Sequence, residues 1–117
     1  MSGIVSRLRD RFGSEQADDA DLRHRSKVSG CARVDQAVLR ERVDLHGEIR
    51  TVSIRPVDDV TALEAELYDG TGTVTLIWLG RRRISGINAG QSLTATGRIG
   101  IRGKERVIYN PAYRLDS

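Results

Sequence analysis

Apolar and polar residues alternate with a period of two along most of the chain from residue 43 onward, which is the pattern of strands that bury one face. The first alternating segment, VDLHGEI, covers residues 43–49, and its phase shifts after Gly47, because Val52 and Ile54 then carry the apolar set. A glycine inside a strand that is followed by a change of phase indicates a bulge or a sharp bend. The pattern therefore predicts a strongly bent first strand.

Four further segments continue the alternation, and turn sequences such as RPVDD, DGTG and RGK separate them. They cover residues 62–68, 73–79, 92–101 and 105–115. Pro111 limits the last segment to an edge or an end of a sheet, because proline lacks the N–H that a central strand donates. The side chains expected in the core are Val43, Leu45, Leu63, Leu67, Val74, Leu76, Leu93 and Ile99.

Trp78 shares a face with the core residues of its own strand, which favours a place in the core. Strand phase is easily misassigned, so contact with a ligand remains the alternative. Tyr68 falls on the outer side of its strand and is the better candidate for stacking on a base. Tyr109 and Tyr113 are expected to pack under the end of the domain.

The first 41 residues do not alternate. Apolar side chains at helical spacing predict two short helical segments, with the stripes Ile4, Leu8 and Phe12, and then Cys31, Val34 and Val38. The polar stretch 14–27 between them is typical of a mobile linker. We therefore expect a helical and linker extension over 1–41 and a β domain over 42–117.

The composition narrows the class of protein. A chain of 117 residues fits a single domain with a modest core. The one cysteine cannot form an internal disulfide, no apolar run reaches the length of a membrane span, and no secretory segment opens the chain. These features favour a cytoplasmic protein without membrane contact.

The net charge of +3 hides an uneven distribution. Residues 1–79 hold 11 basic and 14 acidic side chains, whereas residues 80–117 hold 8 and 2, so the two parts carry −3 and +6. Arg81, Arg82 and Arg83, here called the arginine triplet, follow directly after the third predicted strand. Segregated charge of this kind suggests a basic face and an acidic partner, and the alternative is a merely solvated loop.

Catalytic and metal chemistry have little support in the sequence. His24, Cys31 and His46 are too few and too scattered for a closed zinc site, and Cys31 lies in an apolar stripe. The segment GTGTVT lacks the lysine and the strand-to-helix context of a phosphate-binding loop. We expect no enzymatic activity, no metal and no cofactor.

The ordered set VDLHGEI, LEAELYDGTGTVTLIWLG, AGQSLTATGRIGI and VIYNPAY resembles bacterial OB-fold nucleic-acid-binding domains. It is similar to the wedge-type OB domain of branch-migration DNA helicases and to small stand-alone bacterial OB-fold proteins. The resemblance covers residues 43–115 and is carried by Gly47, by the turn at 69–72, by Gly90 and Gly97, and by the final Asn-Pro pair. It implies a five-stranded antiparallel OB barrel behind an N-terminal helical segment.

One departure from the family concerns the connection 80–91, which has room for only about one turn of the helix that usually joins strands three and four. That end of the barrel then needs another cover. We expect the segment 28–41 to pack there through Cys31, Val34 and Val38. No helicase motor is present in the chain, so no helicase activity is expected.

The resemblance implies a ligand site across strands two and three, flanked by loops. Projected by alternation, the face offers Arg50, Tyr68, Thr75, Ile77, Arg98, Arg102 and Arg106, and the adjoining loop offers Arg81, Arg82 and Arg83. Guanidinium groups suit phosphate, so the expected partner is single-stranded or branched nucleic acid, with DNA as the expected form. Glu64 and Glu66 fall on the same face, argue against tight binding of a polyanion, and are candidates to pair with Arg50 or Arg98.

A function of a different class stays open. The barrel would serve as a platform for protein–protein interaction, with the N-terminal helix or the apolar side chains of Ile77 and Leu79 contacting a protein partner.

Overall fold

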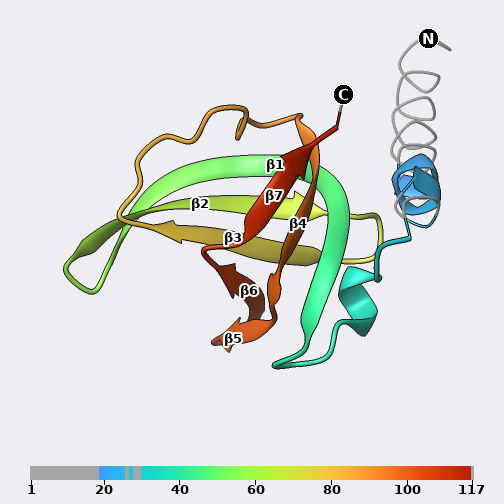
Figure 1. Ribbon diagram of the computed structural model, residues 1–117, viewed down its shortest axis with the longest axis horizontal. Coiled ribbons are helices and arrows are strands. Elements are labelled where there is room, and N and C mark those ends of the chain that lie inside the picture. The colour runs from blue at the N-terminus through green and yellow to red at the C-terminus, as the bar shows by residue number, and fades with distance from the viewer. Residues whose placement is uncertain (1–18, 26, 28–29, 117) are drawn as a thin grey trace, which may run out of the picture.

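The computed structural model describes residues 19–25, 27 and 30–116 of the chain (Figure 1). Its strands are β1 (Arg42–Val57), β2 (Val60–Tyr68), β3 (Thr73–Leu79), β4 (Ser92–Arg98), β5 (Gly100–Arg102), β6 (Glu105–Tyr109) and β7 (Ala112–Leu115). The 3-10 helix η1 (Val34–Gln36) precedes them, and residues 19–25 are α-helical. The helical stripe expected near Phe12 lies outside the described residues.

The seven strands form one mixed sheet in the order β5-β6-β3-β2-β1-β4-β7. β3 and β6 run parallel, whereas the other neighbouring pairs are antiparallel. The order has two ends, β5 and β7, and the sheet is not closed. The expected all-β architecture is therefore confirmed, but the five-stranded antiparallel barrel is wrong in strand number, strand direction and closure.

Two of the predicted strands each divide into two, which explains the difference in number. Ile99 interrupts the segment 92–101, so that β4 pairs with β1 whereas β5 pairs with β6. The last predicted strand breaks at Asn110, whose φ of 50° lies in the left-handed region, and Pro111 has no N–H to donate to a ladder. Periodicity does not reveal these breaks, because apolar residues resume beyond each of them.

β1 is the longest strand and carries the bend that the sequence predicts. It pairs with β4 through its first half and with β2 through its second half. The register with β2 shifts between Ile49 and Thr51, which leaves Arg50 as the bulge residue. Gly47 permits a close approach, since a Cβ there would lie 2.5 Å from the carbonyl oxygen of Tyr68. Figure 1 shows the resulting curve of β1, in green, over the rest of the sheet.

The main core lies on the inner side of this curve. All of the side chains expected there are buried except that of Val43, which is half-buried and packs against the cluster. Ile84 and Ile87, from the connection between β3 and β4, complete the core and were not predicted. Strand alternation cannot identify them because they lie in a loop.

Trp78 belongs to this core, with 6 % of its surface exposed. Its indole Nε1 donates a hydrogen bond to the carbonyl oxygen of Pro111 at 3.1 Å. The ring of Tyr113 meets it edge-on, with 5.8 Å between the centroids. The core interpretation of Trp78 is therefore confirmed, and its ring offers no platform for a ligand.

The segment before β1 covers the core differently from the prediction. Val34, in η1, is fully buried in the main cluster, whereas Val38 is 53 % exposed and Cys31 is half-buried. The α-helix expected through these residues is wrong: the chain makes a single 3-10 turn, so a 3.6-residue spacing no longer places them on one side. One residue of the predicted stripe, Val34, does reach the core.

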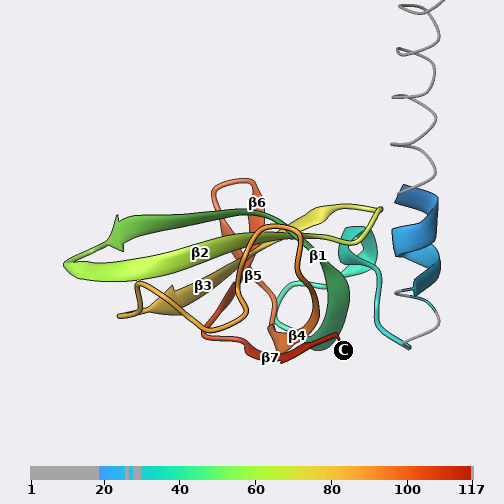
Figure 2. The ribbon, with the colours of Figure 1, turned by 90° about the horizontal axis from the view of Figure 1, so that it is seen from above.

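Residues 19–25 are helical rather than a linker, and Leu22 within them is buried. The guanidinium of Arg23 donates a hydrogen bond to the carbonyl oxygen of Gly70 at 3.0 Å, so the helix lies against the β2–β3 turn. Figure 2 shows this blue helix beside the sheet. Residues 14–18 and residue 26, which belong to the same predicted linker, lie outside the described part of the chain. Within residues 19–25, 27 and 30–116, no helix is long and apolar enough to cross a membrane.

Candidate nucleic-acid interface

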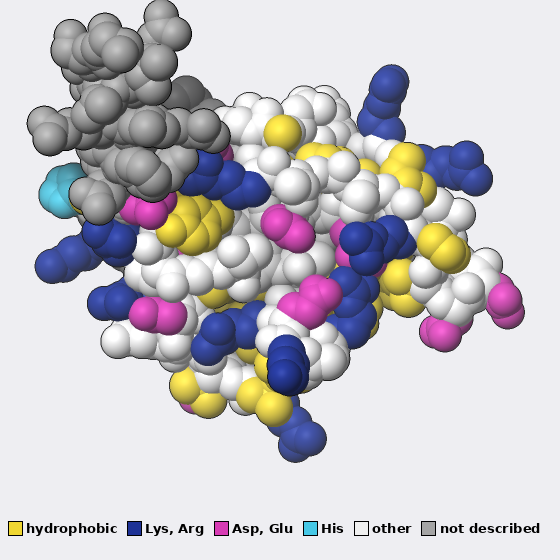
Figure 3. Space-filling view, turned by 180° about the vertical axis from the view of Figure 1, so that it is seen from behind, with side chains coloured by type: hydrophobic (Ala, Val, Ile, Leu, Met, Phe, Trp, Pro, Cys, Tyr) yellow, Lys and Arg dark blue, Asp and Glu magenta, His cyan; other side chains and the backbone are white. Residues whose placement is uncertain are grey.

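The candidate interface is the side of β1, β2 and β3 that faces away from the main core, here called the outer face. Cross-strand pairing places Ser53, Glu64 and Ile77 in one row and Thr51, Glu66 and Thr75 in the next. The view from behind in Figure 3 shows acidic and basic side chains interspersed rather than one continuous basic patch. The charge of the outer face therefore differs from one part of it to another.

The predicted site residues fall at two ends of the outer face. Tyr68 pairs with Thr73 at the beginning of β3, whereas the arginine triplet follows Leu79 at its end. Six residue steps of a strand separate these ends by about 20 Å. The prediction from the sequence placed both groups in a single site.

Tyr68 is partly covered at its end of the face. The guanidinium carbon of Arg50 lies 4.9 Å from the centre of the Tyr68 ring, a cation–π arrangement, and Arg50 also pairs with Glu48 at 3.7 Å. Burial, with a hydrogen bond to Asp19, raises the pKa of Tyr68. Arg50 and Tyr68 thus lie together, and one side of the ring is already occupied by a cation.

Arg102 is held by two carboxylates. Its guanidinium donates a forked pair of hydrogen bonds to Glu64, at 2.8 and 2.9 Å, and a further bond to Glu105 at 2.9 Å. The bond from Arg102 holds the pKa of Glu64 below its ordinary value, and the pKa of Arg102 is raised in turn. The prediction that Glu64 pairs with Arg50 or Arg98 is therefore wrong.

A groove of about 280 Å³ surrounds this ion-pair network. It is lined by Thr51, Ser53, Arg55, Glu64, Glu66, Thr75, Arg102 and Glu105. Three carboxylates and two guanidinium groups give the groove a formal charge of −1. The middle of the outer face is therefore unfavourable for a polyanion.

Thr75 and Ile77 offer a ligand little surface. Thr75 is buried, with its hydroxyl 3.5 Å from a carboxylate oxygen of Glu105. Ile77 is fully buried in a second apolar cluster with Ala62 and Val107. The reason is the parallel pairing of β6 with β3, which places Val107 beside the predicted binding strand. Alternation correctly placed both residues on the outer face but could not show that another strand covers them.

Arg98 and Arg106 lie elsewhere and bind backbone. The guanidinium of Arg98 donates to the carbonyl oxygen of Arg40 at 3.1 Å, and that of Arg106 to the carbonyl oxygen of Asp35 at 3.3 Å. Both bonds join the C-terminal strands to the segment before β1. The two side chains therefore act first as structural links.

The arginine triplet is different. All three side chains are exposed, and none makes a hydrogen bond or an ion pair with any residue that the structure describes. The backbone before them is fixed, because Gly80, with a φ of 75°, donates its N–H to the carbonyl oxygen of Thr61 at 2.7 Å. The triplet thus presents three unneutralised charges from an anchored turn.

Tyr109 and Arg55 are two candidates at the same end that the sequence reasoning missed. Tyr109 pairs with Ile77 across β6 and β3, and 46 % of its surface is exposed. Arg55 pairs with Ala62, which pairs in turn with Leu79 immediately before the triplet. The end of the outer face that carries Arg55, Tyr109 and the triplet is called the arginine end below. The outward phase of Tyr109 follows from its alternation with buried Ile108.

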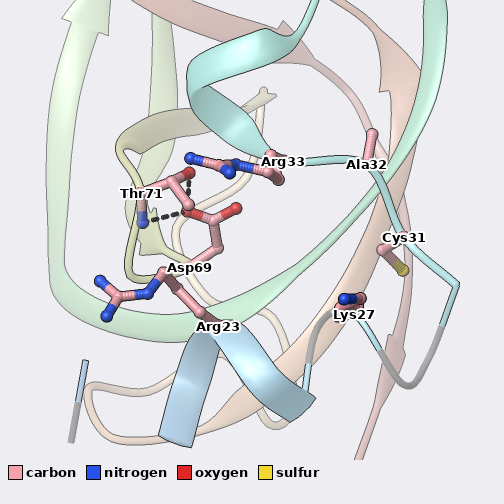
Figure 4. A pocket seen from close by; sticks show the side chains of 7 residues that line it. All are labelled: Arg23, Lys27, Cys31, Ala32, Arg33, Asp69 and Thr71. Atoms are coloured by element: carbon pink, nitrogen blue, oxygen red, sulfur yellow. Dashed lines mark hydrogen bonds between the residues drawn. The ribbon is translucent and has the colours of Figure 1, made fainter. Parts of the chain in front are cut away.

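A larger cavity, of about 330 Å³, lies between the N-terminal helix and the β2–β3 turn. It is lined by Arg23, Lys27, Cys31, Ala32, Arg33, Asp69 and Thr71 (Figure 4). Its charged groups are mostly engaged: Asp69 accepts from the backbone N–H and the hydroxyl of Thr71, and Arg33 pairs with Asp35 at 2.7 Å. Among the described residues, no group of three or more potential ligands could hold a metal ion.

Comparison with known proteins identifies no family: neither a protein-family model nor a curated protein matches the chain.

Proposed function

We propose that the chain is a non-catalytic nucleic-acid-binding protein with an OB-like sheet, which holds single-stranded or branched nucleic acid, with DNA as the expected form, at the arginine end of its outer face. The observation that carries the proposal is the arginine triplet, three exposed guanidinium groups without a partner among the described residues. The resemblance of residues 43–115 to OB-fold domains supports it.

The chemistry of the triplet fits a phosphate backbone. A guanidinium group binds phosphate through paired N–H donors and keeps its charge at every physiological pH. Because no described residue neutralises the three charges, contact with phosphate breaks no ion pair within that part of the chain. Arg55 adds a fourth cation at the same end, and its side chain makes no hydrogen bond with any residue that the structure describes.

Tyr109 supplies the second element of a single-strand site. An exposed aromatic ring beside cationic side chains provides a surface on which a base can stack, worth about 1–3 kcal/mol per base. The residue after Tyr109 is fastened to β3, since the N–H of Asn110 donates to the carbonyl oxygen of Ile77 at 2.6 Å and its side-chain oxygen accepts from the N–H of Leu79 at 3.0 Å. Phosphate contact and stacking would thus occur at neighbouring positions.

The test is a titration of the protein with a fluorescently labelled single-stranded oligonucleotide at a series of salt concentrations. For a single strand, the slope of log affinity against log salt is about −0.7 per phosphate contacted, so three contacts predict a slope of about −2. Changing Arg81, Arg82 and Arg83 together to alanine should weaken binding at low salt and flatten the slope. Folding should be unaffected, because exposed surface side chains contribute little to stability.

The matched control removes the same charge elsewhere, by changing the exposed residues Arg40, Arg42 and Arg114 to alanine. If the triplet acts through contact, this control retains most of the affinity and the parent slope. Equal losses in the two triple variants would mean that only net charge matters. A parent protein that binds no oligonucleotide at low salt would overturn the proposal.

If the parent protein binds no oligonucleotide, the alternative function is that of a protein–protein interaction module, and one observation favours it. Val52 and Ile54, on the core-facing side of the projecting β1–β2 hairpin, are 37 % and 55 % exposed. Leu79 keeps partial exposure, whereas Ile77 is buried and is not available to a protein partner. The same oligonucleotide titration separates the two functions.

A further inference from the structure

The network of Glu64, Arg102 and Glu105 has a consequence for where nucleic acid can lie on the outer face. Arg102 belongs to β5, at one end of the sheet order, and Glu64 belongs to β2, on the far side of β3 and β6. The forked bond between them therefore reaches across the middle of the candidate interface. The N–H groups that donate to this carboxylate are the same ones that would donate to a phosphate, so they are already occupied.

Glu64 is the stronger of the two carboxylate partners. Its side chain is only 5 % exposed, and both of its oxygens accept from Arg102, whereas Glu105 is about half exposed. An ion pair shielded from water is screened little by salt, and breaking it leaves a buried charge uncompensated. A phosphate in solution would have to displace Glu64 at that cost.

We propose that Glu64 is a specificity-determining residue, which mimics a phosphate on Arg102 and so confines nucleic acid to the arginine end of the outer face. The proposal rests on the nucleic-acid-binding function proposed above. It implies that the site is short, because the groove between the two ends carries a net negative charge and the guanidinium of Arg102, one of the two in its lining, is already bound.

The chain supplies a matched control in Glu66. It lies two residues further along β2, on the same face and lining the same groove, and it makes no hydrogen bond or ion pair within the described residues. Glu64→Gln and Glu66→Gln each remove one negative charge from this face. Only Glu64→Gln also removes the forked carboxylate partner of Arg102, leaving Glu105 as its one carboxylate partner among the described residues, so the difference between the variants isolates the effect of Arg102.

The experiment compares the salt dependence of oligonucleotide binding for the parent, Glu64→Gln and Glu66→Gln. Glu64→Gln should bind about three- to tenfold more tightly than the parent at low salt, and its slope should be steeper by about 0.7, corresponding to one further phosphate contact. Glu66→Gln should gain less affinity and keep the parent slope. In Glu64→Gln/Arg102→Ala the extra slope should disappear.

Because Glu64 is buried, unfolding in urea is measured for each variant through the fluorescence of Trp78, the one tryptophan of the chain. Should Glu64→Gln fail to fold, Glu105→Gln decides, since it loosens the same guanidinium from the exposed side and should also steepen the slope. Slopes equal to that of Glu66→Gln in the folded variants would overturn the proposal. If the parent itself binds no oligonucleotide, the proposed function fails instead, so the two failures are distinguishable.

Discussion

The carboxylate of Asp69 accepts a hydrogen bond from the backbone N–H of Val34 at 2.8 Å, although 35 positions separate the two residues. The other oxygen of Asp69 accepts from the N–H groups of Thr71 and Gly72 and from the Thr71 hydroxyl. One buried side chain therefore shapes the β2–β3 turn and fastens the segment before β1 to it. The DGTG sequence, which resembles a simple turn, is also a structural junction.

Replacement of Asp69 should be costly. In Asp69→Asn an amide nitrogen replaces one acceptor oxygen, so at least one buried N–H loses its partner, and we expect a loss of about 2–3 kcal/mol in the free energy of unfolding. Urea unfolding followed by Trp78 fluorescence measures it. Asp58→Asn removes the same charge from the exposed β1–β2 turn and should change stability by less than about 0.5 kcal/mol. Similar stability for the two variants would contradict the role of Asp69.

The two valines of the segment before β1 should behave oppositely. Val34→Ala removes two methyl groups from a fully buried position in the main core, and we expect a loss of about 1.5–3 kcal/mol. Val38→Ala, at a half-exposed position, should be nearly neutral. Thermal or urea unfolding distinguishes them, and equal losses would restore the helical stripe that the sequence predicted.

Tyr109 and Tyr68 offer a comparison of the two ends of the outer face. Tyr109→Ala should weaken oligonucleotide binding by about 1–3 kcal/mol without changing the salt slope, because stacking releases no counterions. Tyr68→Ala should have the smaller effect, because Arg50 already lies over its ring and the triplet lies at the other end of β3. The reverse order of effects would place the bound strand at the Tyr68 end.

The Glu64–Arg102 pair predicts a pH dependence of stability. Arg102 depresses the pKa of Glu64 in the folded protein below its ordinary value of 4.5, so the pair stabilises the fold above that pH, and this contribution is lost as the pH falls through the folded pKa. Glu64→Gln should therefore be less stable than the parent at neutral pH. The difference in unfolding free energy between them should shrink as the pH is lowered below about 4.5. Parallel stability curves would show that the pair contributes nothing that depends on protonation.

Much of the sheet was readable from alternation, because a strand with one buried face has a period of two whatever its neighbours are. That local rule explains why the sequence predicts the core side of Trp78, the strand segments 62–68 and 73–79, and the bend near Gly47. The parallel pairing of β3 with β6 does not, because it depends on which strands meet. The burial of Ile77 was missed for this reason.

The candidate site was readable only in part. The arginine triplet was found because a run of like charge after a strand is visible in the sequence. The engagement of Arg102 was not, since Glu64 lies 38 positions away and only the three-dimensional fold brings the two together. Conversely, Tyr109 was predicted to pack under the end of the domain, whereas it ends β6 beside Ile77 with 46 % of its surface exposed. Long-range pairing therefore decides which of the predicted site residues are free to act.

The same parallel pairing dictates the order in which the protein can be built. β1, β2 and β3 follow one another in the chain and can associate as soon as they are synthesised, but β6 begins only at Glu105, well after β3 ends at Leu79. Until it does, the edge of β3 presents unpaired backbone groups, and Ala62 and Ile77 lack the cover of Val107. A nascent chain, or one cut before residue 105, would therefore expose a strand edge that can pair with another chain. The segment from residue 105 onward thus protects the protein against aggregation.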